Sequence, residues 1–142
     1  MISYDKDFYS WTQEQAELLK HGRFAELDIE NLIEEVETMG RSEKRELESR
    51  LTVLLLHLLK WKYQEVRRGR SWQLSIDEQR IQFSRTLKDN PGLKPKLDEM
   101  ISDAYKLAVI QASRETKISK SVFPELCPWT LEQFIEEGYY PD

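Results

Sequence analysis

Residues 28–72 decide the fold: DIENLIEEVETMGRSEKRELESRLTVLLLHLLKWKYQEVRRGRSW. Two helical patterns meet in this stretch at Gly40. The first is acidic, and its apolar side chains form one stripe of Ile29, Leu32, Ile33 and Val36. Glycine commonly follows the last residue of a helix, and serine commonly caps the next one, so Gly40 and Ser42 predict a break. The stretch therefore predicts a helical hairpin.

The second pattern predicts the central helix of the fold, over residues 42–68. Its apolar residues recur at spacings of 4, 3, 4 and 3, which is the repeat of one helix face. They are Leu47, Leu51, Leu54, Leu58 and Trp61. Val53, Leu55, Leu56 and Leu59 extend the apolar surface around nearly the whole circumference. A helix that is apolar on all sides is surrounded by neighbours, so we expect the other helices to pack around it.

Shorter helices are predicted on both sides of this stretch. The first begins at Ser10 or Thr12, each of which starts a capping-box pattern, and ends at His21-Gly22. Others are expected over residues 72–87, from Pro95 to residue 116, and over residues 130–137. No segment alternates as a strand does. We therefore expect an all-α fold, a single compact bundle of about five helices forming one domain over residues 1–142.

Composition limits the class of protein. The chain has 142 residues, 39% hydrophobic and 33% charged, and its four Trp, six Tyr and five Phe argue against disorder. With one cysteine, Cys127, it forms no intramolecular disulfide. The longest apolar run, residues 53–59, is far too short to span a bilayer, and no secretion or lipidation signal is evident. We expect a cytoplasmic protein that does not contact membranes.

Charge is distributed unevenly along the chain. Residues 1–40 carry ten acidic and three basic side chains, a net charge of −7. Residues 41–70 carry nine basic and four acidic side chains, a net charge of +5. Such asymmetry is typical of a nucleic-acid patch, but two segments of a hairpin that face each other would also produce it. The hairpin predicted at Gly40 favours the second explanation.

Four segments of the chain resemble a known family. They are YDKDFYSW (residues 4–11), LDIENLIEEVETMGRSEKRELESRL (27–51), HLLKWKYQ (57–64) and FPELCPWTLEQ (123–133). In this order they are similar to the largely cyanobacterial family called domain of unknown function twenty-nine. The family often has proline where this chain has Glu65, which favours a longer helix here. The resemblance implies a compact, all-helical cytoplasmic protein, and it supplies no catalytic residues because the family has no established activity.

Three glutamates are placed where metal ligands would be looked for. Glu30, Glu34 and Glu37 lie at spacings of four and three, roughly on one face of the first helix. Di-iron bundles supply Glu-x-x-His from a helix, and this helix lacks the histidine. We therefore expect no metal and no cofactor.

Arg50 and His57 are the candidates for catalysis. They lie seven residues apart on one helix face and loosely resemble the R-x4–6-H signature of HEPN-type ribonucleases. The resemblance implies that the arginine stabilises phosphate charge and that the histidine acts as acid or base. The alternative is structural: Arg50 pairs with Glu46 one turn away, and His57 is a partly buried residue bonded to a carboxylate or carbonyl.

The end of the central helix mixes basic and aromatic residues, as nucleic-acid surfaces do. The candidates for nucleic-acid binding are Lys60, Lys62, Arg67, Arg68 and Arg70. Trp61 and Trp72, however, belong to apolar stripes, and the arginines could cap helix carbonyls. By elimination, we predict a non-enzymatic protein-interaction or regulatory module whose partner is another protein or a second copy. The alternative is a HEPN-like RNA-binding or RNA-cleaving protein, such as one half of a toxin–antitoxin pair.

Overall fold

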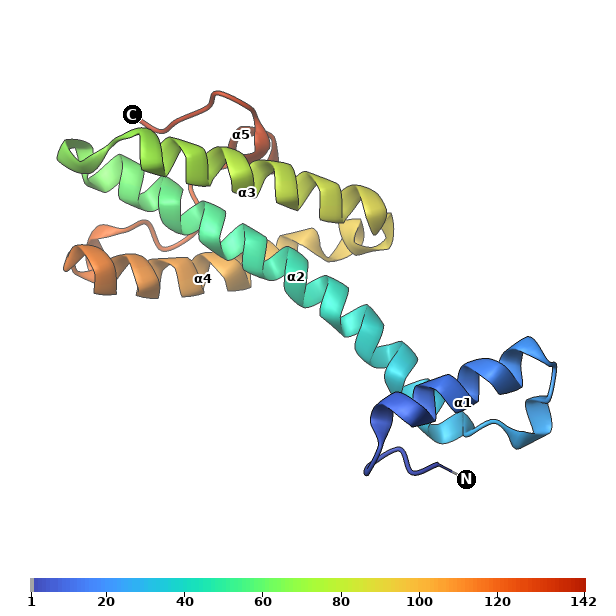
Figure 1. Ribbon diagram of the computed structural model, residues 1–142. Coiled ribbons are helices and arrows are strands. Elements are labelled where there is room, and N and C mark those ends of the chain that lie inside the picture. The colour runs from blue at the N-terminus through green and yellow to red at the C-terminus, as the bar shows by residue number, and fades with distance from the viewer. Residues whose placement is uncertain (1) are drawn as a thin grey trace. The chain divides into compact units, whose positions relative to one another are not determined.

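The computed structural model describes residues 2–142, and in them every regular element is helical (Figure 1). The α-helices are α1 (Phe8–Lys20), α2 (Ile29–Tyr63), α3 (Arg70–Asp89), α4 (Leu97–Thr116) and α5 (Leu131–Ile135). Four 3-10 turns lie between them: η1 (Phe24–Glu26), η2 (Glu65–Arg67), η3 (Pro91–Lys96) and η4 (Lys120–Val122). The predicted all-α class is confirmed.

The chain divides into two compact units, Met1–Ser42 and Glu43–Asp142. The first, which we call the N-terminal unit, contains α1 and the start of α2. The second, the C-terminal unit, contains the rest of α2 and the helices that follow. The expectation of one domain over residues 1–142 stays a prediction.

The predicted bounds of the central helix, residues 42–68, are wrong at both ends: the helix does not break at Gly40, and it ends at Tyr63, before the separate 3-10 turn at Glu65–Arg67. α2 runs without interruption from Ile29 to Tyr63, and Gly40 is not among the residues with positive φ. A glycine inside a helix costs about 0.5–1 kcal/mol, which good helix formers on both sides, such as Met39 and Arg41, help to offset. The helical hairpin is therefore wrong as well. The acidic and basic segments therefore do not face each other across a hairpin, and the hairpin does not explain the uneven distribution of charge.

The C-terminal unit has the core that the apolar seam predicts. The seam residues Leu47, Leu51, Leu54 and Leu58 are completely buried, and Trp61 nearly so. They form one cluster with side chains of α3, α4 and α5, including Ile76, Phe83, Met100, Ala108 and Phe134. Figure 1 shows α3 and α4 running along this part of α2. Each buried leucine contributes about 1.5–3 kcal/mol, so this seam is the main stabilising feature of the unit.

The end of the chain closes over this core. Thr130 caps α5 through a capping box with Gln133, at the expected start of the last helix, which ends at Ile135 and not at the expected residue 137. The cap directs Phe134 into the core, where its ring meets Phe83 edge-on at 6.1 Å between centroids. The tail beyond α5 is then held by arginines of the bundle, which are described below.

The N-terminal unit is organised around Trp11, which is 1% exposed. The rings of Tyr4 and Phe8 both contact it, with centroids at 4.7 and 5.8 Å. α1 is capped by Asp7, whose carboxylate accepts a hydrogen bond from the Ser10 amide at 3.1 Å. The predicted start at Ser10 or Thr12 is therefore too late by three or five residues, since both lie inside the helix that Asp7 caps.

Candidate interaction surface

The start of α2, with Asp28 just before it, presents three rows of side chains. Residues spaced by four and three share a helix face, and one step along the chain turns about 100° around the axis. The packed row is Asp28, Leu32 and Glu35; the apolar row is Ile29, Ile33 and Val36; the acidic row is Glu30, Glu34 and Glu37. Each row is displaced by one residue from the row before it, and each has a different environment.

The packed row joins α2 to α1. The Trp11 indole donates to Asp28 Oδ2 at 2.9 Å, and the Asp28 amide donates to Gln15 Oε1 at 2.8 Å. The Asn31 side chain donates to the same carboxylate at 2.8 Å. The Asn31 and Trp11 hydrogen bonds favour the charged form and hold the pKa of Asp28 below its ordinary value. Asp28 is partly buried and fixed, and its role is structural.

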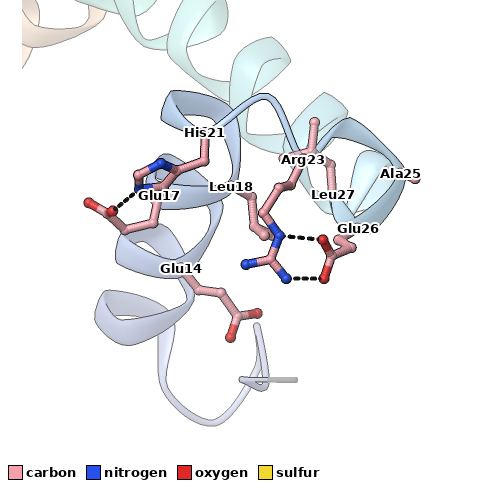
Figure 2. A pocket seen from close by; sticks show the side chains of 8 residues that line it. All are labelled: Glu14, Glu17, Leu18, His21, Arg23, Ala25, Glu26 and Leu27. Carbon is pink, nitrogen blue, oxygen red and sulfur yellow. Dashed lines mark hydrogen bonds and ion pairs between the residues drawn. The ribbon is translucent and has the colours of Figure 1, made fainter.

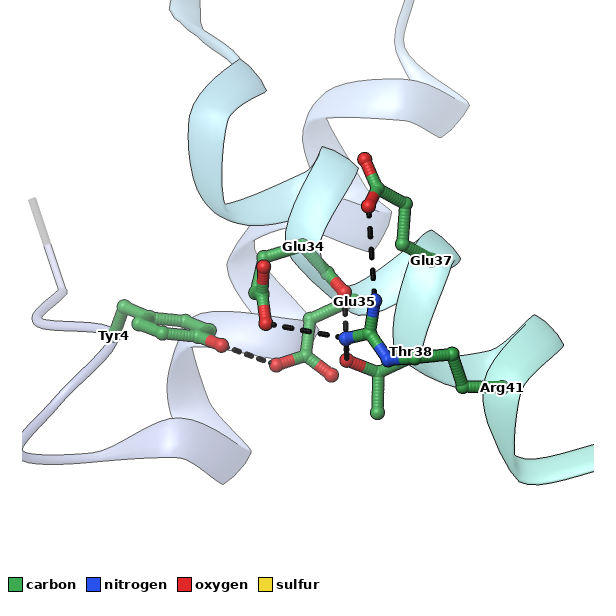
Figure 3. A network of polar contacts seen from close by, with 6 residues as sticks. All are labelled: Tyr4, Glu34, Glu35, Glu37, Thr38 and Arg41. Atoms are coloured by element: carbon green, nitrogen blue, oxygen red, sulfur yellow. Dashed lines mark hydrogen bonds and ion pairs between the residues drawn. The ribbon is translucent and has the colours of Figure 1, made fainter. Parts of the chain in front are cut away.

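Glu35, also in the packed row, binds the N-terminal stretch. The Tyr4 hydroxyl donates to the Glu35 carboxylate, as Figure 3 shows. This hydrogen bond is the main cause that raises the pKa of Tyr4 to about 12, because loss of the proton would place two negative charges together. The packed row is therefore occupied by contacts within the N-terminal unit.

The apolar row is the exposed one of the two. Ile29 is 53% exposed, Ile33 is 52% exposed and Val36 is 64% exposed. Eighteen residues further along α2, which is five full turns, the equivalent positions are Leu47, Leu51 and Leu54, each 0% exposed. The same pattern is thus covered in the C-terminal unit and uncovered in the N-terminal unit. The row is an unpartnered apolar face on a regular helix.

The acidic row borders the apolar row on its other side. Arg41 lies 3.4 Å from Glu34 and 3.7 Å from Glu37, and it also donates to the Thr38 hydroxyl at 2.9 Å (Figure 3). These ion pairs are long and well exposed, so each contributes little. Glu30 forms no ion pair with any residue from 2 to 142. The row therefore keeps a negative character.

A pocket of about 530 Å³ lies between the end of α1 and η1 (Figure 2). Its charged groups pair with one another: His21 lies 3.2 Å from Glu17, and Arg23 makes a bidentate contact with Glu26 at 2.5 and 2.6 Å. Glu14 also lines it, with the apolar side chains of Leu18, Ala25 and Leu27. The two pairs engage Glu17, Arg23 and Glu26 with groups of the pocket wall itself, so nothing in this lining points to a particular ligand.

The structure places Arg50 and His57 on α2 in the C-terminal unit, each bonded within its own helix. Arg50 Nε donates to Glu46 Oε1 at 2.9 Å, and His57 Nδ1 lies 2.8 Å from the Val53 carbonyl oxygen. Both contacts agree with the structural alternative of the sequence analysis, in which Arg50 pairs with Glu46 and His57 bonds to a carbonyl. The catalytic role of the pair stays a prediction.

His57 is expected to titrate below its ordinary pKa of about 6.5. Burial is the largest effect and lowers the pKa of His57. The hydrogen bond with the Val53 carbonyl acts against it, while the charges of Lys60 and Glu115 have still smaller effects of opposite sign. A depressed pKa in the folded state means stability that is present above about pH 6.5 and lost as the pH falls through the folded value. NMR titration of the two histidines, assigned with His21→Asn, tests this, and a midpoint for His57 above 6.5 would contradict it.

Two of the five predicted nucleic-acid residues are used inside the C-terminal unit. Lys60 lies 3.8 Å from Glu115 and over the Trp72 ring at 5.0 Å. Arg68 donates to the Trp61 carbonyl at 2.6 Å, where it caps α2, and to the Asp142 carbonyl at 3.0 Å. The remaining three, Lys62, Arg67 and Arg70, are exposed. Their role in binding nucleic acid stays a prediction.

Arg80 is a buried charged residue that sequence reasoning missed. It is 4% exposed, and its Nε donates to the Phe134 carbonyl at 2.8 Å while Nη2 donates to the Tyr139 carbonyl. Its guanidinium also lies over the Tyr140 ring at 5.4 Å. Burial lowers the pKa of Arg80. Its spacing could have indicated burial, since residues 76, 80 and 83 lie on one face of α3, the face that packs in the core.

The described part of the chain, residues 2–142, contains no helix with the length and apolar character needed to cross a membrane. In the same residues no three His, Cys, Asp or Glu side chains are grouped so that they could hold a metal ion. A family model described as "Domain of unknown function DUF29" matches residues 3–140. No curated protein and no solved structure matches the chain.

Proposed function

This chain belongs to the family of the domain of unknown function DUF29, and we propose that it is a protein-interaction module that binds another protein through the apolar row of α2. The module works without catalysis, and its location is the cytoplasm. The apolar row lies at the start of α2, and the later part of the same helix is packed in the core of the C-terminal unit.

The exposed apolar row carries this proposal. Three branched aliphatic side chains at helical spacing, each more than half exposed, are the pattern of a face that another element covers. Burial of an aliphatic side chain contributes about 1.5–3 kcal/mol, and helices with anchors at i, i+4 and i+7 are a common mode of protein recognition. Ile29, Ile33 and Val36 have this spacing.

Site-specific photo-crosslinking in cells of the source organism tests the proposal. A photoreactive residue replaces Ile33 in the full chain, and a matched chain carries it at Leu107, which is 53% exposed on α4. We expect one defined protein adduct from position 33 that is absent from position 107 and disappears when Ile29→Asp is added. Equal adducts at both positions, or none at position 33, would contradict the proposal.

The alternative is an RNA-binding or RNA-cleaving function of the HEPN type, including a role in a toxin–antitoxin pair. Exposed cations at Lys62, Arg67 and Arg70 support it. RNA binding through these side chains would weaken as salt rises. Salt-independent binding or no binding would contradict this function, and so would RNase activity that persists unchanged in Arg50→Ala and His57→Ala.

A further inference from the structure

We infer that the partner of the apolar row is a basic amphipathic helix of a different protein. This inference rests on the proposed function and adds to it the chemistry of the partner. Three observations carry it: the geometry of the row, the carboxylates beside it, and the poor fit of a second copy.

The geometry of the row suits a helix. Ile29, Ile33 and Val36 lie on one face of a regular helix, and the row spans about 10 Å at 1.5 Å per residue. A partner helix of about three turns could place its own i, i+3 and i+4 side chains between them. A partner strand would find no free backbone groups to pair with here, because inside a helix these groups bond to one another.

The acidic row gives the partner its charge. Glu30, Glu34 and Glu37 each follow an apolar-row residue by one position, so a helix seated on the apolar row runs beside three carboxylates. Residues 1–40 as a whole carry a net charge of −7. Lysine or arginine side chains next to the partner's apolar stripe would meet these carboxylates. The weak contacts of Arg41 are readily exchanged for such cations.

A second copy fits this face poorly in either direction. In an antiparallel pair of α2 helices the two acidic rows would lie against each other, and like charges in an interface are strongly unfavourable. In a parallel pair the acidic row would meet the partner copy's packed row, where Asp28 and Glu35 already accept hydrogen bonds. Both arrangements place carboxylates together, whereas a basic helix neutralises them.

The test measures the binding of the full chain to two synthetic helical peptides by fluorescence anisotropy. Both peptides carry the same leucine stripe; one has lysine and the other has glutamate at the flanking positions. We expect the lysine peptide to bind at low salt and the glutamate peptide to bind at least tenfold more weakly. Binding of the lysine peptide should fall with rising salt, because exposed charges are screened.

Variants locate the binding and separate its two parts. Ile33→Asp should weaken binding of the lysine peptide at least tenfold, whereas Leu107→Asp on α4 should leave it unchanged. The combined Glu30→Gln, Glu34→Gln and Glu37→Gln chain should bind severalfold more weakly and lose most of the salt dependence. Circular dichroism of each variant confirms that the helices are intact.

Three results of these measurements would overturn the inference. They are equal binding of the two peptides, equal losses in Ile33→Asp and Leu107→Asp, and a dimer in light scattering that Ile33→Asp dissolves. A crosslinked partner whose contacting segment is acidic would also overturn it while leaving the proposed function standing. The absence of any adduct at position 33 would instead remove the proposed function itself.

Discussion

Replacement of Arg80 by methionine is expected to lower the free energy of unfolding of the C-terminal unit by about 3 kcal/mol. Methionine fills much of the space of the arginine stem but donates no hydrogen bond. The carbonyl oxygens of Phe134 and Tyr139 would then lose their donors in a buried place, at a cost of about 1–3 kcal/mol each. Part of this cost is offset, because a methionine can be buried without removing a charged guanidinium from water. We expect the loss of the two hydrogen bonds to outweigh this gain, because they also hold the C-terminal tail against the helices.

Arg85→Met is the matched control for this substitution. Arg85 lies on the same helix, α3, and is exposed, so its replacement should change stability by less than about 0.5 kcal/mol. Urea denaturation gives the two free energies. Hydrogen exchange over residues 131–142 should accelerate in Arg80→Met alone. Equal midpoints for the two variants, with a protected tail in both, would show that Arg80 does not hold the end of the chain.

Arg80 also shows where the sequence stopped being informative. Its position at the core repeat between Ile76 and Phe83 was visible, but a charged residue there is normally expected at the edge of a stripe. What keeps it inside is a pair of carbonyls 54 and 59 residues further along the chain. Such partners depend on how the tail folds back, and no local pattern encodes that path.

Local signals failed where several of them competed. Ser10, Thr12 and Asp7 could each cap the first helix, and the structure uses Asp7, while the Thr12 hydroxyl donates to the Tyr9 carbonyl inside α1. At Thr130 the same type of pattern does mark the cap, since the Thr130 hydroxyl accepts a hydrogen bond from the Gln133 amide. Cap patterns therefore indicate that a helix starts nearby. They are less reliable for the residue at which it starts.

Periodicity predicted apolar faces but not what covers them. The seam from Leu47 to Trp61 was expected in the core and lies there. The stripe that begins at Ile29 has the same repeat, yet the side chains of Ile29, Ile33 and Val36 are each more than half exposed. A repeat reports only that one face of a helix is apolar. Whether that face is covered within the chain or by another molecule depends on elements elsewhere, and this difference defines the candidate site.

The second large effect is expected at Gly40, where the hairpin and the continuous helix predict opposite results. Gly40→Pro should destabilise α2 by about 3 kcal/mol or more, because proline removes an amide donor and clashes with the carbonyl four residues before it. Gly40→Ala should stabilise it by about 0.5–1 kcal/mol, since a β carbon there meets nothing within 4 Å. A turn glycine with positive φ would instead disfavour alanine. Thermal unfolding followed by circular dichroism, with hydrogen exchange over residues 36–44, measures both changes, and a stabilising proline with a destabilising alanine would restore the hairpin.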